Sequence, residues 1–146
     1  MADLQILKKE NILLNQPGAD REEIIRRCGR MLADSGYVRE RYIEGMVKRD
    51  NSFSTCIGNH IALPHGEAEY KADIISTGIV VLTYPGGIDW QGMRVYLVIG
   101  IAAKGDQHLD IMGNIVDNLE TGDDVIRLVN EGDVERVYTM LCGDQA

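Results

Sequence analysis

The sequence lacks the features of membrane, secreted and nucleic-acid-binding proteins. The longest apolar run among its 146 residues, Val95 to Ala103, is too short to span a bilayer. The first residues, Met1 to Leu4, lack the basic-then-apolar pattern of a signal peptide. A net charge of −8 argues against nucleic acid as a ligand, because that ligand needs a basic surface. We therefore expect a cytoplasmic protein that does not insert into the membrane.

Cysteine and proline are also scarce. Cys28, Cys56 and Cys142 are odd in number and widely spaced, which predicts reduced thiols rather than a disulfide framework or a zinc site. Only three prolines and no low-complexity run leave no obvious linker. With 45% hydrophobic and 26% charged residues, the chain suits one globular domain, residues 1–146, with a substantial core.

Apolar residues at helical spacing predict several helices. Asp20 and Glu23 resemble a capping box at the start of the first helix, and Gly36 is a natural stop. Cys28 lies on the apolar face of this helix, so core packing explains it. Asp106 is expected to cap a later helix. The predicted helices cover residues 20–36, 39–49, 106–119, 124–129 and 133–141.

Two nearly continuous apolar runs predict strands that are buried on both faces. The first covers residues 78–84 and is expected to end at Pro85-Gly86-Gly87, and the second covers residues 95–103. Shorter candidates are residues 12–14 and 61–63. Helices both precede and follow these strands, so we predict an α/β fold with helices on both faces of a mixed sheet of about five strands.

The stretch Leu63-Pro64-His65-Gly66 is the strongest candidate for a reacting group. Pro64 fixes its own φ and keeps Leu63 extended, and Gly66 can adopt conformations that other residues resist. His65 is thus held where a strand gives way to a turn, a common place for functional groups. A neutral histidine can form covalent intermediates. A backbone carbonyl that accepts one ring N–H would leave the other nitrogen free to attack.

Arg49 and His108 are candidates for binding an anion such as a phosphoryl group. Arg49 ends a predicted helix, and the simplest explanation for a cation there is its favourable interaction with the helix dipole. Its planar guanidinium could instead hold a phosphoryl group through two hydrogen bonds. His108 is expected in the first turn of the helix that Asp106 opens, where free N–H groups bind phosphate. A solvent-exposed histidine is the ordinary alternative.

Other combinations of these residue types are weaker. His60, His65 and His108 could form a three-histidine metal site, but residues 60 and 65 face opposite sides of an extended chain. Cys56 could carry phosphate, but no run of Gly and Ser follows to cradle it. The sequence contains no Walker loop to hold a nucleotide. We therefore predict no metal and no cofactor.

Taken together, the motifs resemble the EIIA domain of the bacterial phosphoenolpyruvate-dependent sugar phosphotransferase system, of the mannitol/fructose type. The resemblance extends over the whole chain. Stretches 77–80 and 84–87 are most similar to the mannitol branch. The most specific parts of the resemblance to the EIIA domain are Arg49-Asp50, Gly58 with Ile61 to Gly66, and Gly100 to Ala103 leading to His108.

The resemblance implies a phosphotransferase, a phosphohistidine carrier in mannitol uptake. HPr would donate the phosphoryl group to His65, through Nε2, and a cysteine of a mannitol-type EIIB would receive it. Arg49 and His108 match the arginine and the second histidine of the family's pocket. Because the sequence ends with this domain, EIIB and the membrane component EIIC are expected to be separate polypeptides.

Two residues depart from the family pattern as we expect it. His60 is not associated with the motif, and Glu67 stands where a small residue is expected. Glu67 would add negative charge near the phosphoryl group and alter the transfer rate or the choice of partner. A regulatory EIIA-like protein of the nitrogen-regulatory type and a metal-dependent hydrolase remain as alternatives.

Overall fold

The computed structural model describes residues 5–52, 54–66, 68–105 and 109–142. Within these ranges one mixed sheet contains five strands, β1 (Leu7–Leu13), β2 (Cys56–Gly58), β3 (Ile61–Ala62), β4 (Gly78–Trp90) and β5 (Met93–Ala102). The order across the sheet is β1-β4-β5-β3-β2. The pairs β1–β4 and β3–β5 are parallel, whereas β4–β5 and β2–β3 are antiparallel. The predicted mixed sheet is confirmed.

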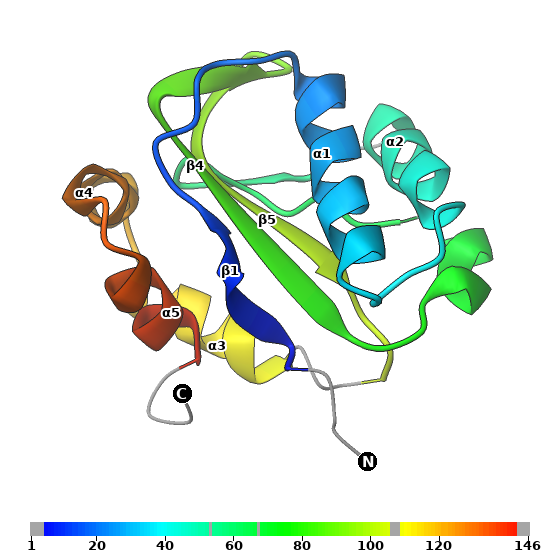
Figure 1. Ribbon diagram of the computed structural model, residues 1–146. Helices are drawn as coiled ribbons and strands as arrows, with labels where there is room; N and C mark the ends of the chain where they lie inside the picture. Colours follow the sequence, from blue (N-terminus) through cyan, green and yellow to red (C-terminus); the bar gives the residue numbers. More distant parts are fainter. Residues whose placement is uncertain (1–4, 53, 67, 106–108, 143–146) are drawn as a thin grey trace.

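Helices cover both faces of the sheet, as predicted (Figure 1). One face carries α1 (Arg21–Asp34) and α2 (Tyr42–Ser52). The other carries α3 (Leu109–Asn118), α4 (Gly122–Glu131) and α5 (Val134–Cys142). A short 3-10 helix, η1 (Ala68–Asp73), precedes β4. None of the helices in the described ranges has the length and hydropathy needed to cross a bilayer.

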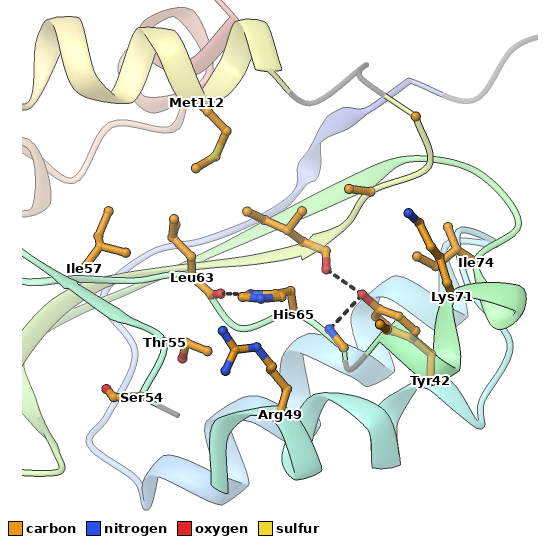
Figure 2. A pocket seen from close by; sticks show the side chains of 15 residues that line it. Tyr42, Arg49, Ser54, Thr55, Ile57, Leu63, His65, Lys71, Ile74 and Met112 are labelled. Atoms are coloured by element: carbon orange, nitrogen blue, oxygen red, sulfur yellow. Dashed lines mark hydrogen bonds between the residues drawn. The ribbon is translucent and has the colours of Figure 1, made fainter. Parts of the chain in front are cut away.

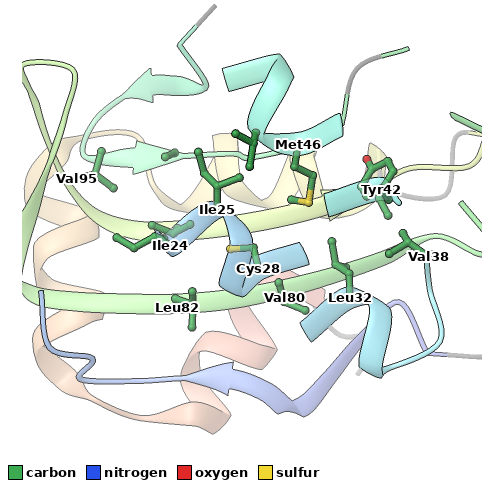
Figure 3. Packing of buried hydrophobic residues seen from close by; sticks show 14 of the residues in the cluster. Ile24, Ile25, Cys28, Leu32, Val38, Tyr42, Met46, Val80, Leu82 and Val95 are labelled. Atoms are coloured by element: carbon green, nitrogen blue, oxygen red, sulfur yellow. The ribbon is translucent and has the colours of Figure 1, made fainter. Parts of the chain in front are cut away.

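Alternate residues of the central strands supply the two cores. In β4, Val80 and Leu82 pack with α1 and α2, whereas Ile79 and Val81 belong to the cluster around α3, α4 and α5. Figure 3 shows Cys28 of α1 among these residues, and its side chain is fully buried. Because successive strand residues point to opposite faces, a strand covered on both sides must be apolar throughout. The two predicted central strands are confirmed on this basis.

The predicted end of β4 at Pro85-Gly86-Gly87 is wrong. The strand continues to Trp90, and its register against β5 shifts between Thr83 and Ile88. Such an irregularity accommodates a proline and glycines without ending the pairing. The chain turns instead at Gln91-Gly92, where φ is +55° and +90°, as a two-residue hairpin turn requires.

Sequence patterns misplaced some other boundaries. The helix predicted over residues 39–49 runs from Tyr42 to Ser52. Asp20 does precede α1, but its side chain makes no capping hydrogen bond. A capping box forms at α4 instead, between Thr121 and Asp124. The predicted cap at Asp106 lies outside the described residues.

Candidate functional site

An open pocket of about 750 Å³ lies at the end of β5, beside the turn that follows β3. Helix α2, the loop that follows it, η1 and α3 contribute the remaining walls (Figure 2). The side chains labelled in that view are Tyr42, Arg49, Ser54, Thr55, Ile57, Leu63, His65, Lys71, Ile74 and Met112.

His65 is held in this pocket by backbone pairing to β5. It forms an isolated parallel bridge with Ile101, whose N–H donates to the Pro64 carbonyl at 2.9 Å. His65 therefore continues the parallel pairing of β3 with β5 by one bridge, after which the chain turns away from the sheet. Its side chain is half-buried and faces the pocket (Figure 2). The predicted junction between strand and turn is present.

The ring of His65 has one nitrogen engaged by the backbone. Nδ1 lies 2.8 Å from the carbonyl oxygen of Leu63. A carbonyl oxygen can only accept, so Nδ1 carries the hydrogen, and in the neutral ring Nε2 keeps its lone pair. The carbonyl partner expected from the sequence is thus identified as Leu63. In this tautomer Nε2 is the ring nitrogen with an available lone pair.

Gly66 is needed for space and not for backbone freedom. Its φ is not positive, so the predicted reliance on an unusual glycine conformation is wrong. A Cβ atom built at this position would lie 2.5 Å from Cε1 of Tyr42. The Gly66 N–H donates to the Tyr42 hydroxyl at 2.9 Å, and that hydroxyl donates to the Ile101 carbonyl at 3.1 Å. Burial raises the pKa of Tyr42, which keeps the hydroxyl protonated as this donor.

Arg49 lies in the last turn of α2 and lines the same pocket as His65. In Figure 2 its guanidinium group points toward the histidine ring from the opposite wall. The structure therefore brings together two of the three residues predicted to form the site. Arg49 can also interact with the end of the α2 dipole, so the two interpretations from the sequence are compatible.

Asp50, the residue after Arg49, anchors this wall, whereas sequence analysis named it only as part of the Arg49-Asp50 motif and gave it no role. Its carboxylate is fully buried and pairs with Arg21 of α1. It also accepts hydrogen bonds from Thr55, through Oγ1 at 2.7 Å and N at 3.3 Å, and from Trp90 Nε1 at 3.3 Å. A usable signal was its helical spacing, because residues 42, 46 and 50 share one inward face.

The pocket is positively charged although the protein is acidic overall. Among its described lining residues are the cations Arg49 and Lys71, and none is an aspartate or glutamate. This contrasts with the net charge of −8. Such a lining favours an anion, and a phosphoryl group is the anion that a neutral histidine can carry. Glu67 lies outside the described residues, so its expected effect stays a prediction.

The other candidate ligands do not gather at this pocket in the part of the chain that the structure describes. His60 belongs to the β2–β3 turn, where Asn59 and His60 both have positive φ. Its Nδ1 donates to the Arg94 carbonyl at 2.9 Å, and its ring packs edge-on against Tyr96. Cys56 lies on β2 and does not line the pocket. His108 lies outside the described residues, and no three potential metal ligands cluster among those described.

The family model described as "Phosphoenolpyruvate-dependent sugar phosphotransferase system, EIIA 2" matches residues 5–142. The chain belongs to this EIIA family. The assignment agrees with the fold and with a pocket that combines a histidine and an arginine. It confirms the resemblance found in the sequence and identifies the chain as a phosphotransferase component.

Named relatives place the chain within the mannitol type of EIIA. It is 41% identical over 128 residues to the mannitol-specific phosphotransferase enzyme IIA component of Bacillus subtilis, covering 87% of this chain and 90% of that protein. It is 38% identical to the mannitol-specific EIICBA component of Vibrio cholerae, covering 96% of this chain but 22% of that protein. An Escherichia coli structure, the complex of enzyme IIAMTL with phosphorylated enzyme IIBMTL, matches with a TM-score of 0.83 and 34% identity, covering 94% of this chain and 99% of that chain.

Proposed function

We propose that this EIIA domain carries a phosphoryl group on Nε2 of His65, which it accepts from phospho-HPr and passes to a cysteine of a mannitol-type EIIB. The hydrogen bond between His65 Nδ1 and the Leu63 carbonyl is the observation that carries the proposal. It leaves Nε2 unprotonated in a pocket whose described lining bears two cations. Membership of the EIIA family supports the same chemistry.

Each transfer is a substitution at phosphorus. The lone pair of Nε2 attacks the phosphoryl group of phospho-HPr, a P–N bond forms, and the bond to HPr breaks with its electron pair left on HPr. In the second step an EIIB thiolate attacks, a P–S bond forms, and the P–N electron pair returns to Nε2. The hydrogen stays on Nδ1 throughout and is donated to the Leu63 carbonyl. Arg49 stabilises the charge on the transferring oxygens, so no metal or cofactor is required.

The proposed partners fit the surface around the pocket. Ile57 lines the pocket and is 56% exposed. Leu109 and Val116 are 53% and 68% exposed and belong to α3, the helix that contributes Met112 to the lining. Exposed apolar side chains at and near a site suit protein partners that dock and leave. The Escherichia coli complex with phosphorylated enzyme IIBMTL supports EIIB as one such partner. We propose that both transfers occur in the cytoplasm and that EIIB links the chain to the membrane component EIIC.

His108 is proposed as the second histidine of the pocket. It directly precedes α3, which begins at Leu109 and contributes Met112 to the lining. A neutral imidazole there would hold the phosphoryl oxygens without carrying the group itself. This role rests on the resemblance and on the position of His108 in the sequence.

Reconstituted transfer tests the proposal. The chain is incubated with phosphoenolpyruvate, enzyme I and HPr, and then with separate EIIB domains for mannitol and for fructose. We expect rapid labelling of the chain and faster onward transfer to the mannitol EIIB. Labelling without transfer to either EIIB would favour the regulatory alternative. Absence of labelling would overturn the proposed function.

A further inference from the structure

A buried carboxylate is connected to His65 by a continuous path of hydrogen bonds. Asp50 holds Thr55 through two contacts, one of them the 2.7 Å bond from Oγ1. The Thr55 carbonyl accepts the Leu63 N–H at 2.9 Å. The Leu63 carbonyl in turn accepts the Nδ1 hydrogen of His65 at 2.8 Å. Three successive hydrogen bonds thus separate the Asp50 carboxylate from the histidine ring.

The position of the Leu63 carbonyl determines what the histidine ring can do. If this oxygen moved away, Nδ1 would lose its acceptor, and the ring could place its hydrogen on Nε2 or rotate. The first change protonates Nε2, and the second turns its lone pair away from the position that the proposed transfer needs. Leu63 follows β3, a strand of only two residues, so pairing within the sheet restrains the backbone of Leu63 only weakly. The hydrogen bond from Leu63 to Thr55 supplies further restraint on the side away from β5.

Asp50 is suited to fix Thr55 because it is itself held from several directions. Its side chain is 0% exposed, and it pairs with Arg21 of α1, whose side chain is 24% exposed. The indole N–H of Trp90, at the end of β4, donates to the same carboxylate. Hydrogen bonds to an ionised acceptor are about twice as strong as neutral ones. The loop after α2 is therefore fixed to two elements outside the pocket.

We propose that Asp50 is a positioning residue for phosphoryl transfer, which holds the Leu63 carbonyl through Thr55 and so keeps His65 in the tautomer with an unprotonated Nε2. This inference rests on the proposed function of His65. Asp50 does not line the pocket and contacts the phosphoryl group at no step. Its effect is on the orientation and tautomer of the ring.

The test compares four variants with the wild type. Asp50→Asn removes the charge that pairs with Arg21, and Thr55→Val removes the hydroxyl donor while leaving that ion pair intact. Thr55→Ser keeps the hydroxyl and is the conservative rescue. Asp73→Asn is the matched control, because Asp73 is also a buried carboxylate and pairs with Arg41 at 3.3 Å, away from this path.

Two measurements are made on every protein. Two-bond ¹H–¹⁵N correlation spectra of the unphosphorylated protein report the tautomer of His65. Steady-state transfer from phospho-HPr reports kcat and KM separately. Loss of a residue that orients a metal-ligating histidine typically reduces metal affinity or activity about 10–100-fold, and we use this range by analogy. We expect a fall of that size in kcat for Asp50→Asn and of about 10-fold for Thr55→Val, with KM changed less than about 3-fold and with protonated Nε2 visible.

The outcomes separate this inference from the proposed function. Wild-type spectra and kcat in Asp50→Asn, or an equal fall in Asp73→Asn, would overturn the positioning role. If Asp50→Asn does not fold, Thr55→Val decides: a wild-type tautomer and kcat overturn the role, and a fall that Thr55→Ser restores supports it. The spectra need no transfer, so a wild-type chain that accepts no phosphoryl group would overturn the proposed function and leave the tautomer result valid.

Discussion

The ring of Tyr42 occupies the space that a side chain at position 66 would need. The Gly66 N–H donates to the tyrosine hydroxyl at 2.9 Å, and any Cβ atom on Gly66 would lie within 2.5 Å of the ring. The tyrosine ring is almost fully buried, so it cannot swing into solvent. A helix side chain thereby sets the path of the turn that carries His65.

Gly66→Ala should destabilise the protein and slow phosphoryl transfer. Relief of the overlap with Tyr42 must move the ring or the turn, and such overpacking costs about 1–3 kcal/mol. Gly113→Ala in α3 is the control, because nothing lies within 4 Å of a Cβ there and alanine favours a helix by up to about 1 kcal/mol. Urea denaturation and transfer from HPr measure both effects. Equal stability and rate in the two variants would contradict the steric explanation.

Arg49→Lys should fold normally and transfer poorly. Lysine keeps the charge but lacks the planar pair of donors that a guanidinium offers to a phosphoryl group. By analogy with the loss of one oriented hydrogen-bond donor, the substitution should reduce transition-state stabilisation by about 2–4 kcal/mol. The rate constant is measured by rapid quench, with circular dichroism as the check on folding. A lysine variant as fast as wild type would show that charge alone is sufficient.

His108→Ala should still accept phosphate on His65 but transfer it more slowly in at least one direction. His108→Gln should recover part of the rate, because its side-chain amide is a neutral donor. Rapid-quench transfer from HPr, and onward to EIIB, distinguishes these cases. Wild-type rates for the alanine variant in both directions would make His108 an ordinary solvent-exposed residue.

Cys28 should make stability fall at alkaline pH. Burial raises the pKa of its thiol from 9.0 to about 12, so between these values the unfolded chain loses a proton that the folded chain keeps. The stabilisation is complete below pH 9 and decreases as pH rises toward 12, by up to about 1.4 kcal/mol per pH unit. Urea denaturation between pH 9 and 11 should show a smaller decrease for Cys28→Ala. Cys56→Ala is the control, because Cys56 is only half-buried. If the stability of wild type and of Cys28→Ala fell equally with pH, Cys28 would not be the source of the decrease.

The parts of the fold that the sequence predicts well are those set by local patterns. The apolar runs of β4 and β5 indicate strands because both faces of the sheet are covered. The strand β2 was not predicted, because its three residues are half-buried or exposed and show no apolar run. The bulge that carries β4 past Pro85 depends on pairing with β5, which no local pattern reveals.

The same distinction applies to the site. His65 and its need for a backbone acceptor follow from the neighbouring residues, and the structure supplies Leu63 as that acceptor. The roles of Tyr42 and Asp50 depend on residues distant in the sequence, Gly66 for one and Arg21 for the other. Those contacts exist only after α1, α2 and β4 have packed together. Such positioning groups are therefore found from the structure.

The central claim is that His65 alone carries the phosphoryl group. The direct measurement is ³¹P and ¹⁵N NMR of the chain after incubation with phosphoenolpyruvate, enzyme I and HPr, for wild type and His65→Ala. We predict one acid-labile phosphohistidine in the wild type, bonded through Nε2 of His65, and none in a folded His65→Ala variant. Undiminished labelling of that variant, or phosphate on Nδ1, would contradict the account.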